Sequence, residues 1–163
     1  MGLFFNRKQK DGAKKNSFDC LTREDIRVGL PPMERFEAIR LAGRMLVERG
    51  SVSEEYIEAM VEREKTVTTY LGEGVAIPHG VGSAKEYIKS TGLVILQFAG
   101  DGVPFEEGNA KLLVGIAGRG EEHLPILQAV ARIIMEEDLL RQLQETDDPD
   151  FILRALTSGE EEA

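Results

Sequence analysis

Residues 92–99 read GLVILQFA, an almost continuous run of apolar side chains that is much shorter than a membrane-spanning helix. A second run, residues 111–118, reads KLLVGIAG and follows a turn expected at residues 100–102. Continuous apolar runs of this length are typical of strands that are buried on both faces of a sheet. The two runs therefore predict a central sheet with a layer of structure on each side.

This centre of the chain is rich in glycine, and helical patterns flank it. Of the 17 glycines, 11 lie in residues 72–120. Before this region, apolar side chains recur at helical spacing up to Gly50, a residue type that commonly ends a helix. Ser51 with Glu54 forms a capping-box pattern, which predicts the start of a second helix that continues to about Lys65.

The clearest helical pattern of the chain begins near His123. Pro125 is tolerated only in the first turn of a helix, where its missing N–H has no partner to lose, so His123 belongs to that turn or just precedes it. Further helical segments are expected around residues 139–143 and 151–156. Helices before and after a buried sheet predict an α/β sandwich, and a length of 163 residues is typical of a single domain.

Composition argues against several classes of protein. With 20 Lys and Arg against 29 Asp and Glu, the formal net charge is −9, which opposes binding to nucleic acid. A single cysteine cannot form an internal disulfide, and no apolar run is long enough to span a membrane. No signal-peptide pattern opens the sequence, so we expect a cytoplasmic protein whose partner is another protein or a small molecule.

The two ends of the chain differ in charge from the rest. Residues 1–16 carry a net charge of +4, so we expect a mobile basic tail, with contact to a membrane surface or a partner as the alternative. Residues 158–163 contain three consecutive glutamates and are expected to form an acidic tail. The folded domain is then expected to span residues 17–157.

The two histidines both lie at junctions between predicted elements. His79 follows Pro78, whose missing N–H is expected either to end strand pairing or to confine the strand to a sheet edge, so that His79 begins a loop. His123 follows a buried strand and stands at a helix N-terminus, which attracts anions. Because ligands of open α/β sheets bind beyond the strand ends, the two histidines could share one crevice. The alternative is that both are solvated surface residues.

Other chemistries have weaker support. Glu121 and Glu122 stand beside His123 and could bind a metal ion, but the helix dipole alone explains acidic residues in a first turn, and we expect no metal site. Cys20 lies among apolar residues and is expected to be buried rather than nucleophilic. The chain contains no Walker loop, no GxGxxG fingerprint and no GxSxG elbow, so no ATP, NAD or other cofactor is expected.

Four motifs in order resemble a known family. They are EREKTVTTYLGEGVAIPHG (residues 62–80), SAKEYI (83–88), KLLVGIAG (111–118) and EEHL (121–124). Together they are similar to the enzyme IIA domain of the mannitol and fructose class of the bacterial phosphoenolpyruvate-dependent sugar phosphotransferase system, and their wording is closest to the mannitol branch. The resemblance extends from about Phe18 to Leu156.

The resemblance implies a phosphotransferase that relays phosphoryl groups. In this family the histidine-containing phosphocarrier protein phosphorylates a histidine that matches His79, and a cysteine of enzyme IIB then takes the phosphoryl group. Arg63 and His123 match positions that line the phosphoryl group. The implied fold is an α/β sandwich with a mixed sheet, and neither ATP nor magnesium takes part. At residues 81–83, Val-Gly-Ser replaces the polar loop that is usual in the family.

The sequence is compatible with more than one role. The implied role is mannitol or fructose uptake with a permease on a separate chain, since no membrane segment is present. The alternative is a regulatory module of the nitrogen-regulatory type, in which phosphorylation of His79 changes contact with a protein partner. A third hypothesis is a metal-dependent hydrolase that uses His79, His123 and nearby carboxylates. Arg63 could instead form a surface ion pair with Glu62 or Glu64.

Overall fold

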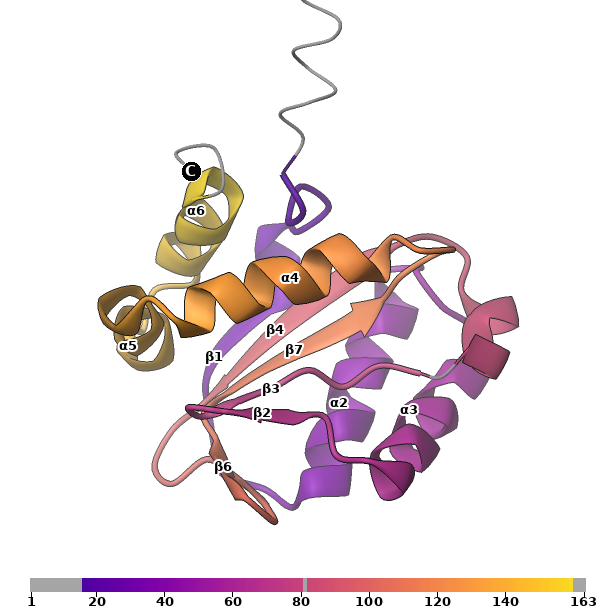
Figure 1. Cartoon of the computed structure of the whole chain (residues 1–163), viewed down its shortest axis with the longest axis horizontal. Coiled ribbons are helices and arrows are strands. Elements are labelled where there is room, and N and C mark those ends of the chain that lie inside the picture. The colour runs from indigo at the N-terminus through magenta and orange to yellow at the C-terminus, as the bar shows by residue number, and fades with distance from the viewer. Residues whose placement is uncertain (1–15, 81, 160–163) are drawn as a thin grey trace, which may run out of the picture.

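The computed structural model describes residues 16–80 and 82–159, and its centre is a mixed sheet of five strands (Figure 1). The strands lie in the order β1 (Ile26–Leu30), β4 (Gly92–Phe98), β7 (Leu112–Ala117), β3 (Val75–Ala76) and β2 (Tyr70–Gly72). β4 and β7 are antiparallel and buried along their whole length, as the two apolar runs predicted. β1 is parallel to β4 and β3 is parallel to β7, whereas β2 and β3 are antiparallel.

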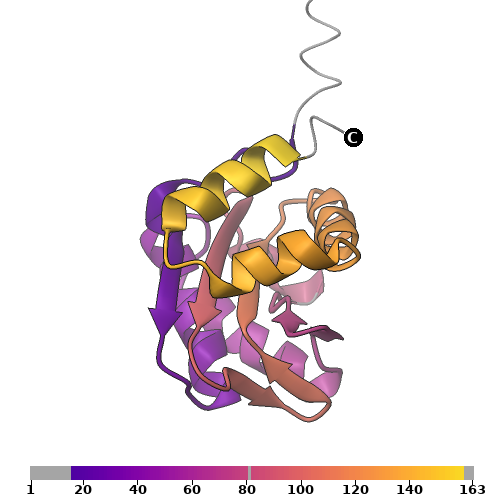
Figure 2. The ribbon, with the colours of Figure 1, turned by 90° about the vertical axis from the view of Figure 1, so that its left-hand side faces the viewer.

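Helices cover both faces of this sheet, which confirms the predicted α/β sandwich (Figures 1 and 2). α2 (Arg35–Glu48) and α3 (Glu55–Thr66) lie against one face. α4 (His123–Ile134), α5 (Glu137–Glu145) and α6 (Pro149–Gly159) lie against the other. The smaller elements are the 3-10 helices η1 (Arg23–Asp25) and η2 (Gly82–Tyr87) and a hairpin of β5 (Val103–Phe105) and β6 (Gly108–Ala110).

Each face of the sheet has its own apolar core, and β4 contributes to both. Leu93 and Ile95 pack with the core of α4, α5 and α6, whereas Val94, Leu96 and Phe98 pack with the core of α2 and α3. Successive side chains of a strand point to opposite faces, so a strand covered on both sides has no position for a polar residue facing water. This is the physical reason for the continuous apolar run.

The connection between α2 and α3 confirms one prediction and corrects another. Gly50 does follow the end of α2, with a positive φ of 84°, and the N–H of Ser51 then closes the helix end on the carbonyl of Leu46 (3.0 Å). The predicted capping box of Ser51 and Glu54 is wrong, because Ser51 is buried and α3 begins at Glu55 without a capping hydrogen bond from Glu54. Backbone pairing with the segment before β4 holds this stretch extended instead.

Several short strands have no counterpart in the sequence-based prediction. β1, β2, β5 and β6 are three to five residues long, and β1 alternates between buried and more exposed side chains at the sheet edge. A strand this short has too few residues to show an alternating apolar pattern, so its sequence cannot be distinguished from that of a loop. Backbone pairing with distant residues defines them, as where Ile26 of β1 lies opposite Ile95 of β4.

The expectation for Pro78 is also corrected. β3 lies inside the sheet, between β7 and β2, and not at an edge. Pairing continues past Pro78, because its carbonyl accepts a hydrogen bond from the Ile116 N–H (3.0 Å) and His79 forms a parallel bridge with Ile116. Proline lacks only the donor, and its carbonyl can still join a sheet.

The folded part of the chain reaches beyond residues 17–157 at both ends. Asn16 is 3% exposed and donates from Nδ2 to the Thr157 carbonyl (2.9 Å), so it belongs to the domain and not to a tail. α6 continues to Gly159, past the expected start of the acidic tail. The remaining tail residues, 1–15 and 160–163, lie outside the described residues. No helix in the described part of the chain is long and apolar enough to cross a membrane.

Candidate functional site

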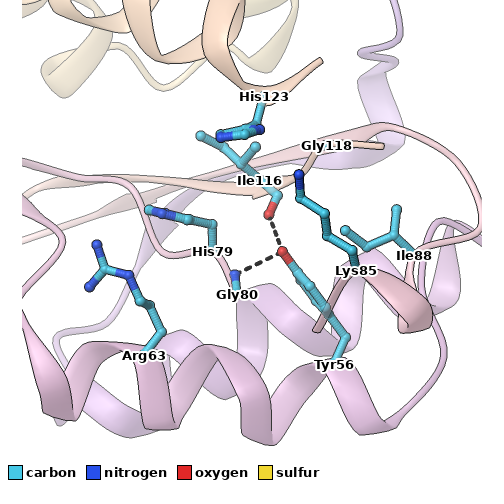
Figure 3. Close-up of a pocket in the computed structure, with 9 residues that line it drawn as sticks. All are labelled: Tyr56, Arg63, His79, Gly80, Lys85, Ile88, Ile116, Gly118 and His123. Carbon is cyan, nitrogen blue, oxygen red and sulfur yellow. Dashed lines mark hydrogen bonds between the residues drawn. The ribbon is translucent and has the colours of Figure 1, made fainter. Parts of the chain in front are cut away.

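A cavity of about 330 Å³ opens where β7 ends and α4 begins (Figure 3). It contains all three residues that the sequence singled out, His79, His123 and Arg63. The prediction that the two histidines share one crevice is therefore confirmed. The lining residues are Tyr56, Arg63, His79, Gly80, Lys85, Ile88, Ile116, Gly118 and His123.

His79 is held by its backbone and by its ring. Its backbone bridges Ile116 of β7, and ring nitrogen Nδ1 lies 2.7 Å from the carbonyl oxygen of Ile77. A carbonyl oxygen only accepts hydrogen bonds, so Nδ1 carries the proton of the neutral ring. The other nitrogen, Nε2, then presents its lone pair, which is the form of imidazole that acts as a nucleophile.

The surroundings of His79 favour this neutral form. Burial lowers the pKa of His79 below its ordinary value of 6.5, and electrostatic repulsion from the neighbouring Arg63 and His123 side chains lowers it further. The hydrogen bond to Ile77 and the negative charge of Glu64 oppose the shift without reversing it. His79 is therefore a neutral imidazole at neutral pH.

Arg63 is free to direct its charge into the cavity. It lies in the last turn of α3, and its Nη1 donates a hydrogen bond to the Val67 carbonyl. Among the described residues it forms no ion pair, since Glu62 pairs with Lys65 (3.3 Å) and Glu64 is hydrogen-bonded to threonines. The surface ion pair considered from the sequence is thus not formed, and Figure 3 shows the guanidinium on the same side of the cavity as the His79 ring.

His123 is the first residue of α4, as Pro125 predicted. A side chain at Gly118 would prevent this placement, because a Cβ there would lie 2.4 Å from the Cβ of His123. The helix dipole gives this end of α4 a partial positive charge. An anion in the cavity would therefore meet a favourable potential from His123 and the helix together.

Side chains from the segment before β4 hold the loop that precedes α4. Thr91 Oγ1 accepts a hydrogen bond from the Arg119 N–H (3.0 Å) and donates one to Glu122. Lys85 Nζ donates to the Gly120 carbonyl (2.6 Å) while its side chain lines the cavity. Glu122 was considered from the sequence as a metal ligand, and its carboxylate accepts this hydrogen bond from the Thr91 hydroxyl. Within residues 16–80 and 82–159 no group of three or more His, Cys, Asp or Glu is arranged to hold a metal ion.

Sequence reasoning missed Tyr56, which forms the floor of the cavity. Its hydroxyl accepts a hydrogen bond from the Gly80 N–H (2.8 Å) and donates one to the Ile116 carbonyl (2.9 Å), as drawn in Figure 3. Burial raises its pKa to about 12. The sequence-based prediction placed Tyr56 only in the helix that continues to about Lys65. The available signal was the phenol itself, because a buried hydroxyl needs hydrogen-bond partners.

Cys20 lies apart from this cavity. The side chain is half-buried, and burial raises the pKa of its thiol above 9.0. A raised pKa keeps the thiol protonated and unreactive at neutral pH. The expectation that Cys20 is not a nucleophile agrees with this setting, although the residue is less buried than expected.

Comparison with known proteins identifies the chain as a component of a phosphotransferase. It belongs to the family described as phosphoenolpyruvate-dependent sugar phosphotransferase system, EIIA 2, which matches residues 19–159. This confirms the resemblance drawn from the four motifs.

Relatives occur as separate enzyme IIA proteins and as longer chains. The mannitol-specific phosphotransferase enzyme IIA component of Geobacillus stearothermophilus is 46% identical over 121 residues, which cover 74% of this chain and 83% of that protein. The PTS system mannitol-specific EIICBA component of Pasteurella multocida is 45% identical over 140 residues, which cover 83% of this chain. The chain spans only 22% of the length of the Pasteurella protein.

Solved structures share the fold. The crystal structure of IIA mannitol from Escherichia coli has a TM-score of 0.77 and 38% identity, and the match covers 83% of this chain and 98% of that one. The complex of enzyme IIAMTL and phosphorylated enzyme IIBMTL from Escherichia coli gives a TM-score of 0.79 and 37% identity, with coverage of 85% and 97%. Nitrogen regulatory protein IIA-Ntr from Neisseria meningitidis has the same fold at 21% identity and a TM-score of 0.66.

Proposed function

We propose that this chain is a mannitol-specific enzyme IIA that carries a phosphoryl group on Nε2 of His79. The observation that carries the proposal is a single cavity in which the free ring nitrogen of His79 is accompanied by Arg63 and His123. The mannitol-specific relatives from Geobacillus stearothermophilus and Pasteurella multocida support the choice of sugar. The proposed relay operates in the cytoplasm, where phosphoenolpyruvate is formed.

The first step is acceptance of the phosphoryl group from the histidine-containing phosphocarrier protein. The lone pair of His79 Nε2 attacks phosphorus, the P–N bond of the donor phosphohistidine breaks, and the donor ring nitrogen keeps the electron pair. The proton on His79 Nδ1 stays on the hydrogen bond to Ile77. Negative charge on the three equatorial oxygens is stabilised by the guanidinium of Arg63 and the ring of His123.

The second step passes the group to a cysteine of enzyme IIB. A thiolate attacks phosphorus, the P–Nε2 bond breaks, and the electron pair returns to Nε2, which restores the neutral ring of His79. Because the proton on Nδ1 never leaves, the site needs no separate base in either step. The Escherichia coli complex of enzyme IIAMTL with phosphorylated enzyme IIBMTL supports enzyme IIB as the partner.

Phosphorylation in a reconstituted system tests this proposal. The protein is incubated with phosphoenolpyruvate, enzyme I and the phosphocarrier protein, and the adduct is located by mass spectrometry. We expect a single adduct on His79 and none in His79→Ala. His123→Ala is the matched control, because it removes the other histidine of the same cavity and should keep the adduct. An adduct of normal stoichiometry in His79→Ala, or an adduct on Cys20 instead, would contradict the assignment.

Transfer from the phosphorylated protein identifies the acceptor. Enzyme IIB proteins for mannitol and for fructose are mixed with it, and the phosphoryl group on their cysteines is measured. We expect faster transfer to the mannitol protein. The regulatory alternative has only a shared fold in its favour, and it predicts transfer to neither enzyme IIB together with phosphorylation-dependent binding of another protein.

A further inference from the structure

One buried carboxylate close to the cavity, that of Glu64, takes no part in the two proposed phosphoryl-transfer steps. Glu64 is 5% exposed, and no Lys, Arg or His of the described residues forms an ion pair with it. Its Oε1 accepts hydrogen bonds from the N–H (2.8 Å) and the hydroxyl (2.6 Å) of Thr69, and its Oε2 accepts one from the hydroxyl of Thr68 (2.5 Å). Burial of a carboxylate is costly, so these donors are what makes the position possible.

The position of Glu64 in its helix adds to this cost. α3 ends at Thr66, so Glu64 lies in the last turn, where the helix dipole disfavours negative charge. A carboxylate there is not explained by the stability of α3 itself. Its hydrogen bonds instead fix the stretch that follows the helix, residues 67–69, which we call the connector.

Two carbonyl groups of the connector each lead to one residue of the cavity. The Val67 carbonyl accepts the hydrogen bond from Arg63 Nη1. The Thr69 carbonyl accepts one from the Ile77 N–H (3.0 Å). Ile77 in turn offers its own carbonyl to Nδ1 of His79 (2.7 Å). Both Arg63 and His79 are thus oriented through the same three-residue stretch.

We propose that Glu64 is a positioning residue, whose carboxylate fixes the connector so that Arg63 faces the cavity and His79 is held with its proton on Nδ1. Glu64 does not line the cavity, so it acts through its neighbours and does not contact the phosphoryl group. The link to phosphoryl transfer rests on the proposed function. The link to the ring tautomer of His79 stands on the hydrogen bonds alone.

Two substitutions at Glu64 separate hydrogen bonding from charge. Glu64→Gln keeps an oxygen acceptor for both groups of Thr69, and its amide can donate to the oxygen of Thr68. Glu64→Ala leaves the Thr69 N–H without its acceptor and releases the connector. We therefore expect Glu64→Gln to behave almost as the wild type, and Glu64→Ala to accept the phosphoryl group at least roughly tenfold more slowly, because small displacements of reacting groups reduce rates strongly.

The spectroscopic measurement is ¹⁵N NMR of the imidazole nitrogens in the unphosphorylated protein. The chain has only two histidines, so the spectrum is simple to assign. In the wild type and in Glu64→Gln we expect His79 with a protonated Nδ1 and an unprotonated Nε2. In Glu64→Ala we expect shifts that report a mixture of the two tautomers. A residue that only stabilises the fold would not change the tautomer in the folded molecules.

Asp25 provides a control with similar hydrogen bonds, and it differs from Glu64 in also forming an ion pair with Arg49 (3.2 Å). It is also buried, at 4% exposed, and its Oδ2 accepts hydrogen bonds from the N–H (2.9 Å) and hydroxyl (3.0 Å) of Thr22. It lies beside β1, at the opposite edge of the sheet from the β2–β3 hairpin that follows the connector. Asp25→Ala should lower stability without changing the His79 spectrum or the transfer rate.

The proposal is overturned if Glu64→Ala is folded and shows both an unchanged His79 spectrum and an unchanged rate. If Glu64→Ala does not fold, the His79 spectrum of Thr69→Val tests the proposal instead. This variant removes one hydrogen-bond donor to Glu64 and keeps the backbone N–H and carbonyl of residue 69. A partial shift of the His79 signals toward a mixture of tautomers supports the proposal, and an unchanged His79 spectrum overturns it. If the wild type itself accepts no phosphoryl group, the proposed function fails, and the NMR comparison still decides the role of Glu64.

Discussion

His79 shows how a ring nitrogen can present its lone pair without an activating base. The Ile77 carbonyl holds the proton on Nδ1, and burial keeps the ring neutral by lowering its pKa. A carboxylate in place of the Ile77 carbonyl would have the opposite effect on the pKa, because its negative charge would stabilise the protonated ring.

The lowered pKa of His79 predicts the pH dependence of phosphoryl acceptance. The neutral ring is the reactive form, so acceptance should persist as pH falls through 6.5, where an ordinary histidine is half-protonated. Arg63→Gln should raise the pKa toward 6.5, because it removes a positive charge that opposes protonation. NMR titration of the His79 ring measures its pKa in the wild type and in Arg63→Gln. A wild-type midpoint above 6.5, or a lower midpoint in Arg63→Gln, would show that the electrostatic account is wrong.

His123 is expected to stabilise the transferring group without being essential for the fold. His123→Ala should still be phosphorylated at His79 but should pass the group to enzyme IIB at least roughly tenfold more slowly, because it loses one preorganised donor while Arg63 remains. Rapid-quench measurement of a single turnover gives the rate.

A control for this prediction lies just beyond the other end of α4. Met135 is 82% exposed and far along the helix from the cavity, so Met135→Ala should transfer at the wild-type rate. His123→Ala with an unchanged rate and an unchanged circular dichroism spectrum would make His123 an ordinary first-turn residue.

At the scale of elements, Tyr56 joins a helix, a strand and the backbone that follows His79. Its hydroxyl links α3 to the Gly80 N–H and to the Ile116 carbonyl of β7. Its ring also explains why residue 80 is glycine, since a Cβ there would lie 2.7 Å from the ring. Helix packing and the position of the backbone beside His79 are therefore coupled at a single side chain.

Tyr56→Phe should weaken this connection. The Gly80 N–H and the Ile116 carbonyl both lose a partner, so the free energy of unfolding should fall by about 1–3 kcal/mol, measured by denaturant titration. The NMR signals of His79 should also shift. Tyr70→Phe is the control, because the Tyr70 hydroxyl accepts one hydrogen bond, from the Gly74 N–H (3.1 Å), outside the cavity. It should lower stability and leave the His79 signals in place, and equal effects of both variants on His79 would argue against the coupling.

At the scale of the whole molecule, the site is assembled at one end of a sheet that is covered on both faces. α3, the residues after β3, η2 and the start of α4 all contribute to the cavity wall. Two separate cores support these elements, one on each face. The cationic groups of the cavity belong to a chain with a net charge of −9, so positive potential is concentrated where a phosphoryl group would bind.

Local patterns were enough to predict much of this molecule. The apolar runs defined β4 and β7, Gly50 defined the end of α2, and Pro125 defined the start of α4. The motifs around the two histidines were enough to predict the family and that these residues share a crevice. Each of these features depends on the periodicity or backbone restrictions of about ten neighbouring residues, which a sequence displays directly.

The tertiary structure alone decided the features that depend on distant partners. It placed β3 inside the sheet, replaced the expected capping box at Ser51 by pairing with the segment before β4, and gave Tyr56 partners 24 and 60 positions away. Hydrogen bonds of buried polar groups are made with whatever the fold brings near, and local sequence carries no record of those partners.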